Sequence, residues 1–198
     1  MSTVNFHSLW QEQCDAHMAV AQETFSLLEP IIQEWITQAT HIIQEGGKIM
    51  FCGNGGSAGD AQHIAAELSV RFIDDRPPIA GLCLSLDPSA ITACANDFGY
   101  EYIFARQIEA LGNPGDMLVG ISTSGKSPNI LKALEMAKTK TIHTVGLTGK
   151  AGDPMKDLCD IFIQVPALKT ANIQEMHIFL GHVFCAGLEQ ALELKHAA

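Results

Sequence analysis

The stretch KIMFCGNGGSAGDAQHIAAELSV, residues 48–70, joins a short apolar run to a helical pattern through the turn GNGGS at 53–57. An apolar run followed by glycines, with a serine at the start of the next helix, is typical of the strand-turn-helix unit of α/β proteins. Glycines let the backbone approach a ligand closely, so the amides of this turn suit an oxyanion. The turn therefore has two interpretations, an anion cradle or only a tight connection with a helix cap.

The rest of the chain repeats the alternation of strand and helix. Further apolar runs cover residues 79–86, 116–122, 141–148 and 159–165, and helical patterns cover 57–70, 88–110, 127–138 and 172–195. Nearly continuous apolar runs fit strands covered on both faces. Strands that alternate with helices predict a parallel sheet in three layers, whose ligand crevice lies at the carboxyl ends of the strands.

Two N-terminal helices are expected over residues 4–28 and 30–46, and they meet at Pro30. The 198 residues fit one domain, residues 1–198, because this length buries a sizeable core without need of a second one. We expect the N-terminal helices, residues 1–46, to pack within the same globule or at a subunit interface.

Composition limits the classes of partner. The net charge is −10 with only 12 lysines and arginines, which argues against non-specific binding to nucleic acid. No apolar run reaches the length of a membrane span, and the start of the chain lacks a signal-peptide pattern. The six scattered cysteines favour reduced thiols. We expect a cytoplasmic protein with neither nucleic-acid nor membrane partners, able to hold an anionic small molecule through local amides and hydroxyls.

The segment LVGISTSGKS, residues 118–127, contains the pattern G-x-x-x-x-G-K-[ST] of a nucleotide-binding P-loop. A P-loop normally follows the first strand of its fold, whereas two predicted strands precede this one, which disfavours an NTPase. What remains is a group of hydroxyls around a glycine at the mouth of a helix, which suits a phosphate monoester; a serine-rich loop with a cap is the alternative. The hydroxyl residues are Ser122, Thr123, Ser124 and Ser127.

Two helical segments carry candidate metal ligands. His63 and Glu67 are spaced i, i+4, which places both on one helix face, and Gln174 and His182 lie on one stripe of the last helix. Together the four side chains would form a nitrogen and oxygen set compatible with zinc. A surface pair and a hydrogen-bonded core histidine explain the same residues without a metal. Asn96 and Asp97, in ANDFGY at 95–100, would either form a turn or bind sugar hydroxyls.

Taken in order, the motifs resemble those of the phosphoheptose isomerases, a family of sugar isomerase (SIS) domain proteins. The motifs are CGNGGS, DAQHIAAEL, NDFGY, GISTSGKS, LTGKAG and IQEMHIFLGH, and the resemblance runs from about residue 45 to 185. It implies a flavodoxin-like sheet of five parallel strands and a homotetramer with active sites at subunit interfaces. The implied activity is aldose-ketose isomerisation of sedoheptulose 7-phosphate to D-glycero-D-manno-heptose 7-phosphate, for lipopolysaccharide or a related surface glycan.

The resemblance also implies roles for individual residues. Glu67 would be the catalytic base and His182 the catalytic acid, and one zinc ion per subunit would be held by His63, Glu67, Gln174 and His182. Ser57 and Arg71 lie beside the substrate-contacting positions and are included with them. The substrate-binding set is Asn54, Gly55, Gly56, Ser57, Glu67, Arg71, Asn96, Asp97, Ser122, Thr123, Ser124, Ser127 and Gln174.

Two departures from the family pattern leave a second interpretation open. Lys126 replaces the asparagine usual in STSGNS, which creates the P-loop match and adds a cation near the expected phosphate. Ala58, Gly59 and Gln62 are similar to a related SIS protein that binds the replication initiator DnaA, so the alternative function is a non-catalytic phosphosugar-binding regulator. That relative lacks counterparts of Glu67 and His182, whose presence favours an enzyme.

Overall fold

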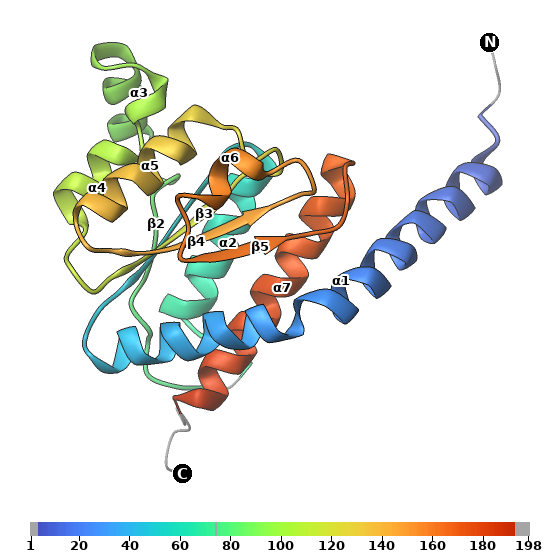
Figure 1. The fold of residues 1–198 in the computed structure, drawn as a ribbon, viewed down its shortest axis with the longest axis horizontal. Coiled ribbons are helices and arrows are strands. Elements are labelled where there is room, and N and C mark those ends of the chain that lie inside the picture. The colour runs from blue at the N-terminus through green and yellow to red at the C-terminus, as the bar shows by residue number, and fades with distance from the viewer. Residues whose placement is uncertain (1–3, 74, 193–198) are drawn as a thin grey trace.

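The computed structural model describes residues 4–73 and 75–192 and is built on a central parallel sheet (Figure 1). The sheet has five strands in the order β2-β1-β3-β4-β5, and every neighbouring pair is parallel. This confirms the predicted flavodoxin-like topology and places the carboxyl ends of all strands at one edge. The strands are β1 Ile49–Gly53, β2 Gly81–Cys83, β3 Met117–Ile121, β4 His143–Thr148 and β5 Ile161–Gln164.

Helices cover both faces of the sheet, as the continuous apolar runs predict. In β1, Ile49 and Phe51 point into one core and Met50 and Cys52 into the other. One face packs on α1, α2 and α7 and the opposite face on α3, α4 and α5, which confirms the three-layer prediction. The helices are α1 Phe6–Gln44, α2 Gly56–Ser69, α3 Pro88–Asp97, α4 Ala105–Leu111, α5 Pro128–Thr139, α6 Asp153–Lys156 and α7 Thr170–Ala191.

The predicted break of the N-terminal helices at Pro30 is wrong. α1 is one helix of 39 residues with Pro30 inside it, and Figure 1 shows a bend about midway along its length. A proline removes one hydrogen bond and bends a helix without necessarily ending it. Continuity is favoured by burial on both sides of the proline, because Leu28 and Trp35 enter the same core. Trp35 stacks on Phe184 of α7, with ring centroids 3.9 Å apart.

The single helix predicted over residues 88–110 is also wrong. The structure has α3, a 3₁₀ turn at Tyr100–Tyr102 and then α4. Gly99 separates them with φ +105°, a conformation that only glycine adopts without strain. The short α6 was not predicted, and α7 begins at Thr170. Residues 193–195 of the predicted last helix lie outside the described residues. Within residues 4–73 and 75–192, no helix has both the length and the apolar character to cross a membrane.

His177 of α7 is fully buried at the carboxyl end of β4. Its Nε2 lies 3.2 Å from the carbonyl oxygen of Thr148, so the N–H of the neutral imidazole donates a hydrogen bond to that carbonyl. Burial lowers the pKa of His177 to about 4, although the hydrogen bond opposes this shift. Its Nδ1 has no hydrogen-bond partner among the described residues. The buried ring is therefore neutral at physiological pH.

This burial predicts a pH-dependent loss of stability. The unfolded histidine titrates at an ordinary pKa of 6.5, so protons favour the unfolded chain below that pH. The contribution of His177 is complete above pH 6.5 and is lost as the pH falls toward 4, amounting to about 3 kcal/mol. Urea unfolding at pH 7 and pH 4.5 should show this difference between wild type and His177→Gln, which removes the titrating group. An identical pH dependence in the two proteins would contradict the assignment.

Candidate active site

The turn after β1 is held by a pair of amides that join it to α5. Asn54 Nδ2 donates to Asn129 Oδ1 at 2.9 Å, and Asn129 Nδ2 donates back to Asn54 Oδ1 at 2.8 Å. The hydroxyl of Tyr100 also donates to Asn54 Oδ1, at 3.0 Å. The sequence reasoning missed Asn129 and Tyr100. Asn129 follows Ser127 by two residues, and Tyr100 is the last residue of the motif NDFGY, so nearness to a motif was the available signal.

Gly56, the first residue of α2, brings α7 against this turn. A Cβ atom at Gly56 would lie 2.5 Å from Nε2 of Gln174, so a larger residue there would displace the Gln174 amide. Gly55 has φ +56° and Ser57 is buried beneath the turn. The structure therefore gathers Asn54, Gly55, Gly56, Ser57 and Gln174 at the N-terminus of α2, where the helix dipole favours an anion.

The loop after β3 presents its hydroxyls at the neighbouring strand end. Ser122 Oγ lies 3.0 Å from Ser127 Oγ, and Ser124 Oγ accepts a hydrogen bond from the backbone of Lys126 at 3.2 Å. Thr123 and Ser124 line a pocket of about 120 Å³ that also contacts the start of α7 at Thr170. All four predicted hydroxyl residues thus lie in one loop before α5, whose N-terminus also favours negative charge.

The two helices α2 and α7 bring the candidate acid, base and metal ligands together. His63 Nε2 lies 2.9 Å from His182 Nε2 and 3.3 Å from Glu67 Oε1. The helices approach closely at Gly181, where a Cβ atom would lie 2.4 Å from Cδ1 of Ile64. The ring of Phe72 stacks on His182, with centroids 5.4 Å apart. One imidazole nitrogen of His63 is therefore placed between a carboxylate and a second imidazole.

Asp60 is a further titratable group of this site that the sequence reasoning missed. Burial raises the pKa of Asp60 to about 6, and the charge of His63 opposes the shift. Its Oδ2 is buried and has no hydrogen-bond partner within residues 4–73 and 75–192. The spacing i, i+3 from His63 on α2 was the signal in the sequence. The carboxyl therefore takes up a proton at a higher pH than an ordinary aspartate.

His63 contacts two of the other three predicted zinc ligands, Glu67 and His182, and Gln174 does not join them. Gln174 precedes His182 by eight residues, about 12 Å along α7, and contacts Gly56 instead. Among the described residues, no three or more His, Cys, Asp or Glu side chains are arranged as a metal-binding group. The donors that do converge, two imidazoles and one carboxylate, are of the types that zinc binds.

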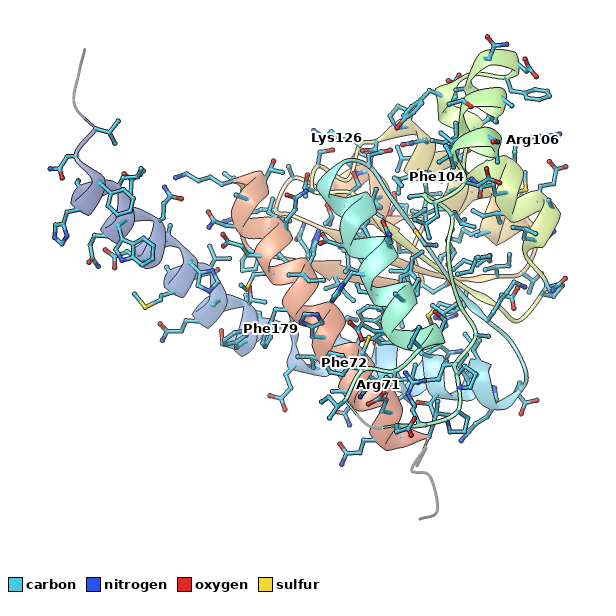
Figure 2. All side chains as sticks on the ribbon, turned by 180° about the vertical axis from the view of Figure 1, so that it is seen from behind. Arg71, Phe72, Phe104, Arg106, Lys126 and Phe179 are labelled. Atoms are coloured by element: carbon cyan, nitrogen blue, oxygen red, sulfur yellow. The ribbon has the colours of Figure 1, made fainter. Side chains whose placement is uncertain are left out.

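The remaining predicted residues, Asn96, Asp97 and Arg71, are exposed. Asn96 and Asp97 are exposed at the end of α3, not directly after β2, and Asn96 Nδ2 donates to Asp97 Oδ1 at 2.8 Å. Arg71 is exposed in the segment after α2. Figure 2 shows Lys126 beside the N-terminal end of α2 and Arg71 and Phe72 beside its C-terminal end.

Comparison with known proteins identifies the family. The SIS domain family model matches residues 14–149. The phosphoheptose isomerase of Rhodospirillum rubrum is 50% identical over 163 residues, 82% of this chain and 87% of that protein. A phosphoheptose isomerase of Campylobacter jejuni is 48% identical over 181 residues, 91% of this chain and 95% of that protein. The chain belongs to the phosphoheptose isomerase family of SIS domain proteins.

Solved structures of phosphoheptose isomerases have the same fold. The structure of GmhA from Neisseria gonorrhoeae is 35% identical, covers 94% of this chain and 100% of that chain, and has a TM-score of 0.89. The structure from Francisella tularensis has the same identity and coverage, with a TM-score of 0.92. The chain thus shares its fold with phosphoheptose isomerases over most of its length.

Proposed function

We propose that the chain isomerises sedoheptulose 7-phosphate to D-glycero-D-manno-heptose 7-phosphate, supplying heptose for lipopolysaccharide or a related glycan. The observation that carries the proposal is the position of His63 Nε2, 2.9 Å from His182 and 3.3 Å from Glu67. His63 thereby connects the proposed base Glu67 on α2 with the proposed acid His182 on α7, and a proton transfer between adjacent carbons requires such a pair. Family membership supports an enzyme over the DnaA-binding regulator.

In the proposed mechanism, Glu67 removes a proton from C1 of the open-chain ketose and returns it to C2. The electron pair released at C1 forms the C1–C2 double bond of an enediol while His182 protonates the carbonyl oxygen at C2. His182 then recovers a proton from the hydroxyl at C1 as the new aldehyde forms, so both groups return to their starting state. The hydrogen-bonded His63 keeps the imidazole of His182 oriented.

The phosphate would bind to the loop of Ser122–Ser127 with Asn54 and Gln174 nearby. Its charge is favoured by the N-termini of α5 and α2. Binding energy gained at the phosphate then aligns the distant reacting carbons. Along α2, Glu67 lies eleven residues from Gly56, about 16 Å. This separation supports a site to which a second copy of the chain contributes.

A zinc ion is the proposed cofactor, one per subunit, with His63, Glu67 and His182 as the residues of this chain that would hold it. Gln174, the fourth expected ligand, lies about 12 Å from His182 along α7. The two imidazoles fit such a site, because two Nε2 atoms bound to one tetrahedral zinc lie about 3.3 Å apart, close to the 2.9 Å between His63 and His182. When bound, the ion would polarise substrate oxygens as a Lewis acid.

A homotetramer is the proposed assembly, because large apolar side chains of α1 are exposed. The N-terminal half of α1 extends away from the sheet (Figure 1) and exposes Phe6, Leu9 and Trp10. An apolar groove of about 710 Å³ between α1 and α7 is lined by Phe25 and Phe179. A contiguous apolar surface of this kind indicates a protein interface. Light scattering should give four chains per particle, and a monomer would refute the assembly.

The test of function is an isomerase assay with sedoheptulose 7-phosphate, before and after chelation. We expect the aldose phosphate as product, a loss of most turnover after chelation, and recovery on adding Zn²⁺. Full activity after verified metal removal would refute the zinc proposal alone. No turnover by the zinc-loaded protein, together with capture of DnaA, would replace the enzyme by the regulatory alternative.

A further inference from the structure

A buried ion pair joins the segment after α2 to the end of α7. Arg76 Nε lies 2.5 Å from Glu189 Oε1, and the two side chains are 0% and 6% exposed. Burying two charges costs more than their attraction returns unless the remaining donors and acceptors are also satisfied. Glu189 belongs to α7 and Arg76 follows α2, so the pair connects the two helices that carry the candidate acid and base.

The hydrogen bonds of Arg76 hold the last turn of α2. Its Nη2 donates to the carbonyl oxygen of Glu67 at 2.7 Å, and its Nη1 donates to the carbonyl oxygens of Leu68 at 2.9 Å and Pro77 at 3.0 Å. Carbonyls in the last turn of a helix have no partner within the helix. Arg76 therefore caps α2 at the residue proposed as the catalytic base.

The hydrogen bonds of Glu189 hold the segment that covers His182. Glu189 accepts from the backbone N–H groups of Phe72 at 3.0 Å and Ile73 at 3.3 Å. Phe72 in turn stacks on His182, with an interplanar angle of 22°. The ion pair thus contacts the backbone of one proposed catalytic residue and the backbone of the ring that packs against the other.

We infer that Arg76 and Glu189 are positioning residues of the isomerase, which set Glu67 and His182 in register across α2 and α7. This inference rests on the proposed function. Proton transfer needs the base and the acid within hydrogen-bond reach of the substrate, and a displacement of about 1 Å costs up to about 100-fold in rate. A pair that only closed the loop would affect stability and leave turnover per folded molecule unchanged.

Asp116 provides a matched control. It accepts two backbone N–H groups, those of Lys48 and Asn113, and pairs with the Lys48 ammonium, and its side chain is 4% exposed. The hydrogen bonds therefore match those of Glu189, but they join the loops before β1 and β3, at the sheet edge opposite the strand ends that carry the loops of the site. Asp116→Asn should lower the melting temperature without changing kcat.

The experiment measures kcat, KM and melting temperature for Arg76→Lys, Glu189→Gln and Asp116→Asn. We expect kcat to fall about 10- to 100-fold in the first two variants, with KM within about threefold because the phosphate loop is untouched. Phe72→Leu removes only the ring on His182 and should lower kcat even if the ion-pair variants do not fold.

Two results would overturn the inference. One is a kcat within about threefold of wild type in every folded variant of Arg76, Glu189 and Phe72, because positioning residues should give a loss of at least about 10-fold. The other is an equal loss of kcat in Asp116→Asn, which would mean that any loss of fold stability lowers kcat, wherever the residue lies. An inactive wild type would instead refute the proposed function, so the two failures are distinguishable.

Discussion

Glu67→Gln is expected to abolish nearly all isomerase turnover, with kcat reduced about 1,000-fold or more. The amide keeps the shape of the side chain and can still accept a hydrogen bond from His63, but it cannot take a proton from carbon. The backbone of α2 is retained, because the carbonyl of Glu67 and not its side chain binds Arg76. Initial rates at saturating sedoheptulose 7-phosphate measure the effect.

The control for this variant is Glu109→Gln, at an exposed carboxylate on α4 whose partner is Arg106. It should leave kcat and KM unchanged. Glu67→Gln should also keep KM within about threefold, since hydroxyls and helix N-termini at the other end of the site bind the phosphate. A Glu67→Gln enzyme with kcat near wild type would mean that another group removes the proton.

His182→Gln is expected to give the second largest loss, with kcat falling about 100- to 10,000-fold. The glutamine amide can replace Nε2 as the neighbour of His63, but it cannot donate and recover a proton near neutral pH. The helix contact through Gly181 and Ile64 is unchanged, so the variant should fold. Comparison of kcat with KM separates the loss of proton transfer from a loss of binding.

His41→Gln is the matched control for this histidine, because His41 lies in the last turn of α1 and lines a separate cavity. It should have wild-type kinetics. If His182→Gln retained more than about a tenth of wild-type kcat, a loss below what proton-transfer groups normally contribute, the acid would have to be sought elsewhere. Asp60, with a pKa of about 6, would be the next candidate.

Much of the fold could be predicted because its signals are local. The central strands β1, β3 and β4 are apolar runs covered on both faces, and α2 and α5 begin and end within one residue of the predicted positions. The predictions were wrong where tertiary contacts or a single backbone conformation determine where a helix continues or ends. Burial of Leu28 and Trp35 keeps α1 continuous through Pro30, and the positive φ of Gly99 ends the helical pattern after α3.

The candidate site could be predicted only as far as its parts lie on single elements. The spacing of His63 and Glu67 on one helix face, and the hydroxyls of the loop before α5, follow from the sequence alone. Asn129 escaped prediction because its partner Asn54 is 75 residues away and either side chain alone is an ordinary polar residue. Arg76 and Glu189 escaped for the same reason, since they are 113 residues apart.

The sequence by itself determined the five strands in their order, the glycine-rich and serine-rich loops and the pair on α2, because hydrophobic periodicity and turn chemistry act over a few residues. Only the tertiary structure decided that His182 faces His63 while Gln174 lies two turns away against Gly56. That register depends on how closely α7 approaches α2 at Gly181 and Ile64. Close packing between segments that are far apart in the sequence sets such contacts, and the hydrophobic periodicity within one segment does not predict them.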